Sequence, residues 1–219
     1  TGVRGVRCTP ASASHYRRIL MRKDEKHKTS MEKQKTSVDA SIAAADTEKS
    51  VVLLLTGNGK GKTSSAFGMV MRAMGYEQRV GIVQFIKGQQ LSGEELFCRS
   101  ALPQGDFYQM GTGFTWDTQD RQADIKAAER TWHEASRMLS DPIYELVILD
   151  ELTYMLSFGY LDEAAVLEAV KCRPDHQSVV ITGRGGGTGL QDLADTVSEV
   201  KEIKHAFRAG VKARRGVDY

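Results

Sequence analysis

The residues best suited to chemistry lie in one glycine- and lysine-rich segment, which reads Thr-Gly-Asn-Gly-Lys-Gly-Lys-Thr from Thr56 to Thr63. The segment follows an apolar run of strand length and opens a stretch of helical composition, which is the context that a phosphate-binding loop requires. Glycines let several backbone N–H groups point at one anion, and the helix N-terminus adds the positive end of its dipole. We predict that ATP or GTP is bound here by Gly57, Asn58, Gly59, Lys60, Gly61, Lys62, Thr63 and Ser64.

Two side chains of this loop have distinct predicted roles. Lys62 would bring a positive charge to the phosphates, and the hydroxyl of Thr63 can ligate Mg²⁺. Thr56 stands where the standard pattern has a glycine, although Gly57 and Gly59 can supply the missing flexibility. The alternative is a glycine-rich turn that binds nothing, and the Gly-Lys-Thr sequence at a strand-to-helix turn argues against it.

Two consecutive carboxylates, Asp150 and Glu151, follow an apolar run at 146–149. Because parallel sheets bind ligands at the carboxyl ends of their strands, these side chains are predicted to lie beside the phosphate loop. There a carboxylate can hold Mg²⁺ directly or through water. Taken alone, an acidic pair after a strand is often only a solvated turn. Together with the loop it indicates a nucleotide site but no particular reaction, because this fold hosts kinases, motors, switches and transferases alike.

The elements that must position these residues alternate along the chain from residue 51 onward. Unbroken apolar strands separated by helices predict an α/β fold, with a mostly parallel sheet of five or six strands and helices on both faces. Strands are expected at 51–55, 79–85, 107–110, 146–149, 178–181 and 197–203. Helices are expected at 62–74, 94–101, 121–140, 152–158, 161–171 and 190–194. One face of the helix at 121–140 is apolar and includes Trp132, which we expect to pack in the core.

Charge and composition divide the chain into three parts. Residues 1–50 hold 11 Lys and Arg against 6 Asp and Glu, whereas residues 51–219 hold 19 against 22. We expect residues 1–23, which are basic and contain no acidic residue, to form a disordered tail, with a remnant of an organelle targeting segment as the alternative. Residues 24–50 are expected to form a helical arm with a narrow apolar stripe. The remainder, 51–219, is expected to be the nucleotide-binding domain.

Bulk composition excludes several classes of protein. The chain is 41% hydrophobic and 26% charged, as is typical of globular proteins. No apolar run approaches the roughly 18 residues that cross a membrane, so we expect a soluble protein with no membrane partner. The widely spaced cysteines, Cys8, Cys98 and Cys172, indicate a reducing compartment rather than a disulfide framework. We expect a cytoplasmic location, or an organelle matrix if residues 1–23 are a transit remnant.

Six further segments follow the phosphate loop in a recognisable series. They are VQFIKG at 83–88, GTGFTWDT at 111–118, DELTYM at 150–155, ITGRG at 181–185, ADTVSE at 194–199 and HAFRAGVKA at 205–213. In sequence and in order, these segments and the loop resemble the P-loop family of ATP:corrinoid adenosyltransferases, also called cob(I)alamin adenosyltransferases. The resemblance spans residues 51–219, and the arm before them is similar in character to the N-terminal helix of that family.

The resemblance implies a P-loop NTPase-like fold of the recombinase-like class and an enzyme of the EC 2.5.1 type. In that family the reduced cobalt of cob(I)alamin, or of a precursor, attacks the 5′ carbon of ATP and displaces the whole triphosphate. The reaction serves adenosylcobalamin synthesis or salvage. Lys62, Glu151 and Arg184 are then expected to be catalytic, and Thr63, Asp150 and Glu151 to hold Mg²⁺ or Mn²⁺. Without the family resemblance, Arg184 could equally be interpreted as a surface arginine in a loop.

Two aromatic side chains in the segment 111–118, Phe114 and Trp116, are costly to leave exposed. Taken alone, they are more simply interpreted as packing in the core of their own domain. The resemblance instead implies that they bind the corrinoid and displace the lower axial ligand of its cobalt, which would ease reduction of Co(II) to Co(I). It also implies a homodimer and a separate flavoprotein, or reduced flavin, as the electron donor. A further hypothesis is that the arm at 30–47 closes over the corrinoid.

Three other functions stay open on the sequence. A generic P-loop ATPase or kinase would share the loop and Asp150, but it would release ADP instead of triphosphate. A nucleic-acid-binding ATPase is disfavoured, because residues 51–219 have no basic excess for a phosphate backbone, and we expect no nucleic-acid partner. A nucleotide-gated corrinoid carrier would bind both ligands and release no triphosphate.

Overall fold

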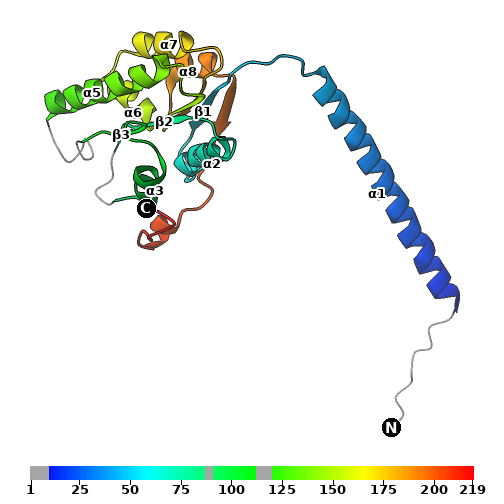
Figure 1. Cartoon of the computed structure of the whole chain (residues 1–219). Coiled ribbons are helices and arrows are strands. Elements are labelled where there is room, and N and C mark those ends of the chain that lie inside the picture. Colours follow the sequence, from blue (N-terminus) through cyan, green and yellow to red (C-terminus); the bar gives the residue numbers. More distant parts are fainter. Residues whose placement is uncertain (1–9, 87–90, 112–119) are drawn as a thin grey trace. The chain divides into compact units, whose positions relative to one another are not determined.

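The computed structural model of the chain describes residues 10–86, 91–111 and 120–219 (Figure 1). The chain divides into two compact units, Thr1–Glu48 and Lys49–Tyr219. The boundary between them lies close to residue 51, where the alternating pattern of strands and helices was expected to begin. None of the helices in the described ranges combines the length and the apolar character that a bilayer crossing requires.

The first unit contains one long helix, α1, from Pro10 to Ala44. It begins earlier than the expected start at residue 24, because proline is well tolerated in the first helical turn and neither glycine nor proline interrupts residues 11–44. From Met21 to Ala44 every side chain of α1 is exposed, including Val38 at 49% and Ile42 at 67%. The apolar stripe therefore buries nothing within this unit.

The second unit is built on a six-stranded sheet with the order β3-β2-β4-β5-β1-β6. All five strand pairs are parallel, which confirms the expected sheet. Its strands are β1 (Val52–Thr56), β2 (Val80–Gln84), β3 (Phe107–Gln109), β4 (Leu146–Asp150), β5 (Ser178–Thr182) and β6 (Thr196–Glu199). The strand that precedes the phosphate loop, β1, and the strand that ends in Asp150, β4, are separated by β5.

Helices cover both faces of this sheet, as expected, with α5, α7 and α8 on one side of the strands and α2 and α3 on the other (Figure 1). The helices are α2 (Lys62–Gly75), α3 (Gly93–Ala101), α5 (Arg121–Ser140), α6 (Leu152–Ser157), α7 (Glu163–Lys171) and α8 (Gly187–Leu193), and η1 (Ala206–Ala209) is a 3₁₀ turn. Alternate residues of a strand point to opposite faces of the sheet and pack in two hydrophobic cores, one on each face. Leu54 and Leu149 pack with α5 to α8, whereas Leu55 and Ile148 pack with α2 and α3. A strand buried on both faces has to be apolar throughout, as these strands are.

The helix α5 confirms the expected core position of Trp132. Ala128, Ala135 and Leu139 are buried on the same face, and the Trp132 ring lies 6.5 Å from the Phe85 ring, centroid to centroid. Two other elements differ from expectation. The helix α8 begins at Gly187 instead of residue 190, because buried Leu190 anchors its first turn on the core. The edge strand β6 ends at Glu199 instead of residue 203.

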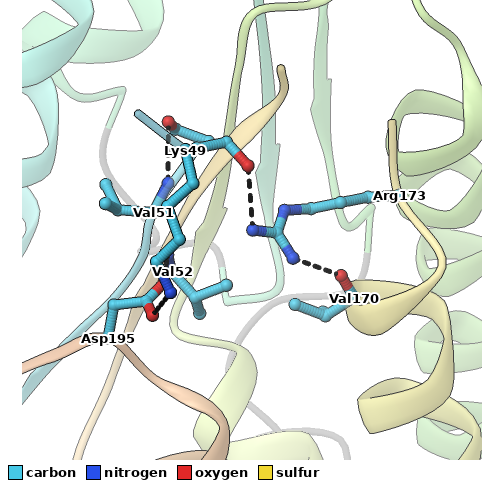
Figure 2. Close-up of polar contacts among 8 residues, drawn as sticks. Lys49, Val51, Val52, Val170, Arg173 and Asp195 are labelled. Carbon is cyan, nitrogen blue, oxygen red and sulfur yellow. Dashed lines mark hydrogen bonds and ion pairs between the residues drawn. The ribbon is translucent and has the colours of Figure 1, made fainter. Parts of the chain in front are cut away.

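Polar contacts at the amino end of β1 fix its position between its two neighbours (Figure 2). The Val51 N–H donates to Ser178 Oγ at 3.2 Å, and the Val52 N–H donates to Asp195 Oδ2 at 2.9 Å. The Arg173 guanidinium donates to Ser50 Oγ at 3.1 Å and to the Val170 carbonyl at 2.8 Å. These bonds join the starts of β1, β5 and β6, and so set where the opposite ends of the strands meet.

Candidate functional site

The phosphate loop runs from the end of β1 to the start of α2 and is braced from outside. Gly57 has a φ of 98°, and a Cβ at that position would lie 2.5 Å from the Val200 carbonyl oxygen, so no other residue fits without a shift. The Gly59 N–H donates to the same oxygen at 2.7 Å. The segment that follows β6 therefore holds the loop in shape, a contact that the spacing of the loop residues did not reveal.

Lys62 is 7% exposed and folds back over the loop. Its ammonium donates to the carbonyl oxygens of Gly57 at 2.8 Å and Gly59 at 2.9 Å. Burial lowers the pKa of Lys62, and the charge of Arg184 adds to this effect, while Glu151 and Asp150 oppose it. The loop thus carries a partly desolvated cation at its centre, where an anion would stabilise the charge.

Asp150, the last residue of β4, is buried and has both carboxylate oxygens engaged. Oδ1 accepts from Thr63 Oγ1 at 3.0 Å and from Thr182 Oγ1 at 2.6 Å, and Oδ2 accepts from Gln84 Nε2 at 3.0 Å. Burial raises the pKa of Asp150, and these hydrogen bonds oppose the rise. Asp150 therefore links the phosphate loop to the ends of two other strands.

Two glutamines and one threonine in this network were missed as site residues from the sequence. Thr182 ends β5, Gln84 ends β2, and Gln109, which ends β3, donates from Nε2 to Gln84 Oε1 at 3.0 Å. The sequence did hold a signal, since each is a polar residue that closes an apolar strand. That signal becomes informative only when the strands are known to be neighbours.

Glu151 has an unusual backbone and a free carboxylate oxygen. It is left-handed, with φ 59° and ψ 23°, and its N–H donates to Thr182 Oγ1 at 3.0 Å. Its Oε2 is buried and accepts no hydrogen bond from the described part of the chain. Burial first, and then the charge of Asp150, raise the pKa of Glu151 to about 7, against the opposing effect of Lys62 and Arg184. Such an oxygen is well placed to receive a cation or a ligand proton.

Arg184 is exposed in the loop that follows β5. This loop is held at two points: Thr153 Oγ1 donates to the Arg184 carbonyl at 2.9 Å, and Thr56 Oγ1 donates to the Gly185 carbonyl at 2.6 Å. The charge of Arg184 lowers the pKa values of both Lys62 and Glu151, so the guanidinium lies within electrostatic reach of each. The loop is therefore anchored at the arginine and at the residue that follows it.

These elements enclose a cleft of about 1180 Å³ at the carboxyl ends of the strands. Its rim includes the end of the chain, where Lys60 Nζ lies 2.9 Å from Asp218 Oδ1. The expected site residues that line the cleft are Asn58, Gly59, Lys60, Gly61, Lys62, Thr63, Ser64, Asp150, Glu151 and Arg184. Gly57 lies just beneath them, with its carbonyl bonded to Lys62. Phe114 and Trp116 lie outside the described residues.

The chemistry of this cleft follows from its charges. Backbone N–H groups at the start of α2, together with Lys62 and Arg184, suit a polyphosphate. The oxygens of Thr63 and Glu151 are the hard ligands that Mg²⁺ prefers. A cleft of about 1180 Å³ is larger than the roughly 300–1,000 Å³ typical of a small-molecule pocket.

Known proteins resemble the chain over most of its length. The family described as ATP:corrinoid adenosyltransferase BtuR/CobO/CobP matches residues 48–219. The corrinoid adenosyltransferase of Pseudomonas aeruginosa is 51% identical over 90% of this chain and 97% of its own length. Corrinoid adenosyltransferase CobA of Salmonella typhimurium is 49% identical over 90% and 99% of the two chains, and the corrinoid adenosyltransferase of Sinorhizobium sp is 38% identical over 90% and 92%.

Among solved structures, the Hef helicase domain of Pyrococcus furiosus has a TM-score of 0.41 at 14% identity, over 80% of this chain and 40% of that chain. This likeness is too low to bear on the site.

Proposed function

Because the chain belongs to the ATP:corrinoid adenosyltransferase family, we propose that the cleft described above is the place where ATP meets the cobalt of a reduced corrinoid. The enzyme transfers the adenosyl group of ATP to a corrinoid in cobalamin synthesis. The observation that supports this location is the convergence of Lys62, Thr63, Glu151 and Arg184 on one cleft beside the phosphate loop.

In this proposal the residues from Gly57 to Ser64 bind the triphosphate as a leaving group. The cobalt contributes an electron pair to a new bond with the 5′ carbon of ATP, while the bond from that carbon to oxygen breaks and the pair leaves with the triphosphate. Negative charge therefore grows on the triphosphate during the step. In this proposal Lys62, held by its bonds to Gly57 and Gly59, meets that charge together with the loop N–H groups and Arg184. Donors that are in position before the reaction lower its barrier in this way.

The donor set of the cleft fits Mg²⁺ or Mn²⁺. Glu151 presents a buried Oε2 without a hydrogen bond, and Thr63 donates its proton to Asp150, which leaves hydroxyl lone pairs for another partner. When bound, the cation would neutralise part of the triphosphate charge. We propose Thr63 and Glu151 as its direct contacts. Asp150, whose oxygens already accept three hydrogen bonds, would act through Thr63 or through water.

The corrinoid side of the proposal rests on the family resemblance. Phe114 and Trp116 come after β3 in the chain, and the last residue of β3, Gln109, lines the cleft. The chain therefore leaves β3 beside the cleft, which supports the proposal. We propose that both aromatics contact the corrinoid and displace the lower ligand of its cobalt.

A Trp116→Ala variant should then slow the reaction that starts from Co(II) far more than the reaction given preformed Co(I). Equal slowing of the two reactions would contradict the role proposed for Trp116.

We also propose a homodimer, a separate flavoprotein or reduced flavin as electron donor, and a cytoplasmic location.

One experiment tests the main proposal. The protein is mixed with ATP, Mg²⁺ and chemically reduced corrinoid, the cobalt–carbon bond is followed by absorbance, and the phosphate products are assayed. Adenosyl transfer at this cleft predicts free triphosphate in proportion to the new bond, and loss of both in the Lys62→Ala variant. Release of ADP would instead support a generic ATPase. Binding of both ligands without triphosphate would support a carrier.

A further inference from the structure

Thr182 performs two tasks with one hydroxyl at the centre of the site. It is fully buried, donates to Asp150 Oδ1 at 2.6 Å, and accepts the Glu151 N–H at 3.0 Å. A threonine hydroxyl has one proton and two lone pairs, so both bonds form at once. The two hydrogen bonds therefore hold the side chain of Asp150 and the backbone of Glu151, the next residue.

The bond from the Glu151 N–H to Thr182 Oγ1 stabilises a backbone conformation that is unfavourable by itself. Glu151 is left-handed, which costs a residue other than glycine about 1–2 kcal/mol. The left-handed Glu151 caps α6 without using its carboxylate, because no side-chain hydrogen bond forms at that cap. The carboxylate is therefore left for the cleft. The bond from the Glu151 N–H to Thr182 Oγ1 stabilises the left-handed backbone from which this carboxylate projects.

The first bond acts on the phosphate loop. The Asp150 Oδ1 that Thr182 donates to also accepts from Thr63 Oγ1 at 3.0 Å. By fixing this oxygen, Thr182 fixes where the proton of Thr63 points and which lone pairs of Thr63 face the nucleotide. One hydroxyl thus orients both of the oxygen donors that the proposed function assigns to the cation.

Strand order explains why residue 182 holds this place. β5 pairs with β1 on one side, where Thr182 is in register with Leu55, and with β4 on the other. The last residue of β5 therefore lies between the strand that enters the phosphate loop and the strand that ends in Asp150. A valine would fill the same volume without either hydrogen bond.

From this geometry we infer that Thr182 is a positioning residue for adenosyl transfer, which orients Glu151 and Thr63 toward the cation of the bound ATP. The inference rests on the proposed role of Glu151 as a contact of that cation. Thr182 is fully buried and is not among the residues that line the cleft, so its effect should appear in cation binding as well as in turnover.

The test measures binding of Mn²⁺ as a spectroscopic probe. The full chain is mixed with ATP in the absence of corrinoid, and free Mn²⁺ is counted from its paramagnetic resonance signal. We expect Thr182→Val to weaken Mn²⁺ binding by about tenfold or more, since a hydrogen bond to a charged group is lost. Thr182→Ser keeps the hydroxyl and should stay within about twofold of the native protein. With corrinoid present, kcat should fall in Thr182→Val while the KM for corrinoid stays nearly unchanged.

A matched control separates position from stability. Thr131 is also buried, but its hydroxyl donates only to the Ala127 carbonyl within α5, at 2.8 Å. Thr131→Val should lower the melting temperature and leave Mn²⁺ binding alone. If Thr182→Val does not fold, Thr182→Ala takes its place. A Thr182→Val or Thr182→Ala variant that binds Mn²⁺ as well as the native protein would overturn the inference.

The Glu151→Gln variant distinguishes this failure from a failure of the proposed function. If Glu151→Gln weakens Mn²⁺ binding and Thr182→Val does not, only the role of Thr182 is lost. If Glu151→Gln binds Mn²⁺ like the native protein, the cation contact proposed for Glu151 is wrong and the inference is lost with it.

Discussion

At the scale of single residues, Lys62 shows how a site can be prepared for a charge before it arrives. Within the described part of the chain, its ammonium is hydrogen-bonded only to uncharged carbonyl oxygens of its own loop. Neutral partners stabilise a cation less than anionic ones do, so the arrangement gains most when a polyphosphate enters. The Lys62 charge should therefore stabilise the bound triphosphate, and also the negative charge that grows on the triphosphate as it leaves.

We expect Lys62→Ala to lower adenosyl transfer by at least about a hundredfold, as the loss of a preorganised donor does elsewhere. The rate is followed by absorbance of the cobalt–carbon bond. Lys201→Ala serves as the control, because Lys201 lies against the same loop but pairs with Glu199 at 3.2 Å. Lys201→Ala should keep nearly full activity. A Lys62→Ala variant with more than about a tenth of the native rate would contradict the role proposed for Lys62.

Glu151 gives a prediction about pH. Burial and the charge of Asp150 raise its pKa from 4.5 to about 7 in the folded protein. The folded state therefore binds more protons than the unfolded state between these values, and the contribution of Glu151 to the free energy of unfolding falls as pH rises through them. Without ATP or metal, Glu151→Gln should match the native protein near pH 4.5 and be more stable above pH 7, by roughly 1–3 kcal/mol.

The measurement is urea unfolding of both proteins at several pH values. Glu134→Gln is a control of opposite sign, since hydrogen bonding to Arg137 lowers the pKa of Glu134. That variant should lose stability relative to the native protein above the ordinary pKa of a glutamate. A Glu151→Gln variant that tracks the native protein at every pH would mean that the carboxylate is not desolvated.

At the scale of elements, the loop after β5 depends on one glycine. Gly183 has a φ of 144°, and a Cβ there would lie 2.0 Å from Thr153 Oγ1. The same Thr153 hydroxyl donates to the Arg184 carbonyl and so anchors the loop that carries the arginine. Close approach of α6 to this loop is thus possible only without a side chain at residue 183.

Gly183→Ala should therefore destabilise the fold by roughly 2 kcal/mol or more, because it combines backbone strain with a collision. Chemical denaturation measures this change. Gly93→Ala makes the matched comparison, since Gly93 begins α3 and a Cβ there would meet nothing within 4 Å. It should be neutral or stabilising, because alanine is the better helix former. Equal stability of the two variants would contradict the close contact.

At the scale of the whole molecule, the chain divides into two compact units that differ in what their surfaces offer. Every residue that lines the cleft belongs to the Lys49–Tyr219 unit, within the described part of the chain. The other unit offers an exposed apolar stripe on α1 that includes Val38 and Ile42. We propose that this arm serves the corrinoid, while the nucleotide depends on the second unit.

Removal of residues 1–47 should keep ATP affinity within about twofold and weaken corrinoid binding by about tenfold, a loss of roughly 1.4 kcal/mol. Calorimetric titration of each ligand checks both values. The truncation keeps Lys49 and its ion pair with Asp195, so the start of β1 stays anchored. An unchanged corrinoid affinity would refute the role of the arm, and a loss of ATP binding would show that the second unit is not independent.

By itself, the sequence determined the kinds of element, the nature of the loop and the family. Apolar runs and helical stretches are local patterns, and the phosphate loop is contiguous, so spacing along the chain suffices to predict Lys62 and Thr63. Asp150 and Glu151 could be added because a parallel sheet gathers the ends of its strands at one edge. The resemblance of seven ordered segments then named a reaction that no single motif could.

Only the tertiary structure decided which strand ends touch. Parallel connections can place the next strand on either side of the sheet, so nothing in the local sequence says that β5 lies between β1 and β4. That order brings Thr182 to Asp150 and makes the left-handed turn at Glu151 stable. Side chains far apart in the chain form a site through distances that depend on the whole packed sheet, whereas periodicity reports only on neighbours along the chain.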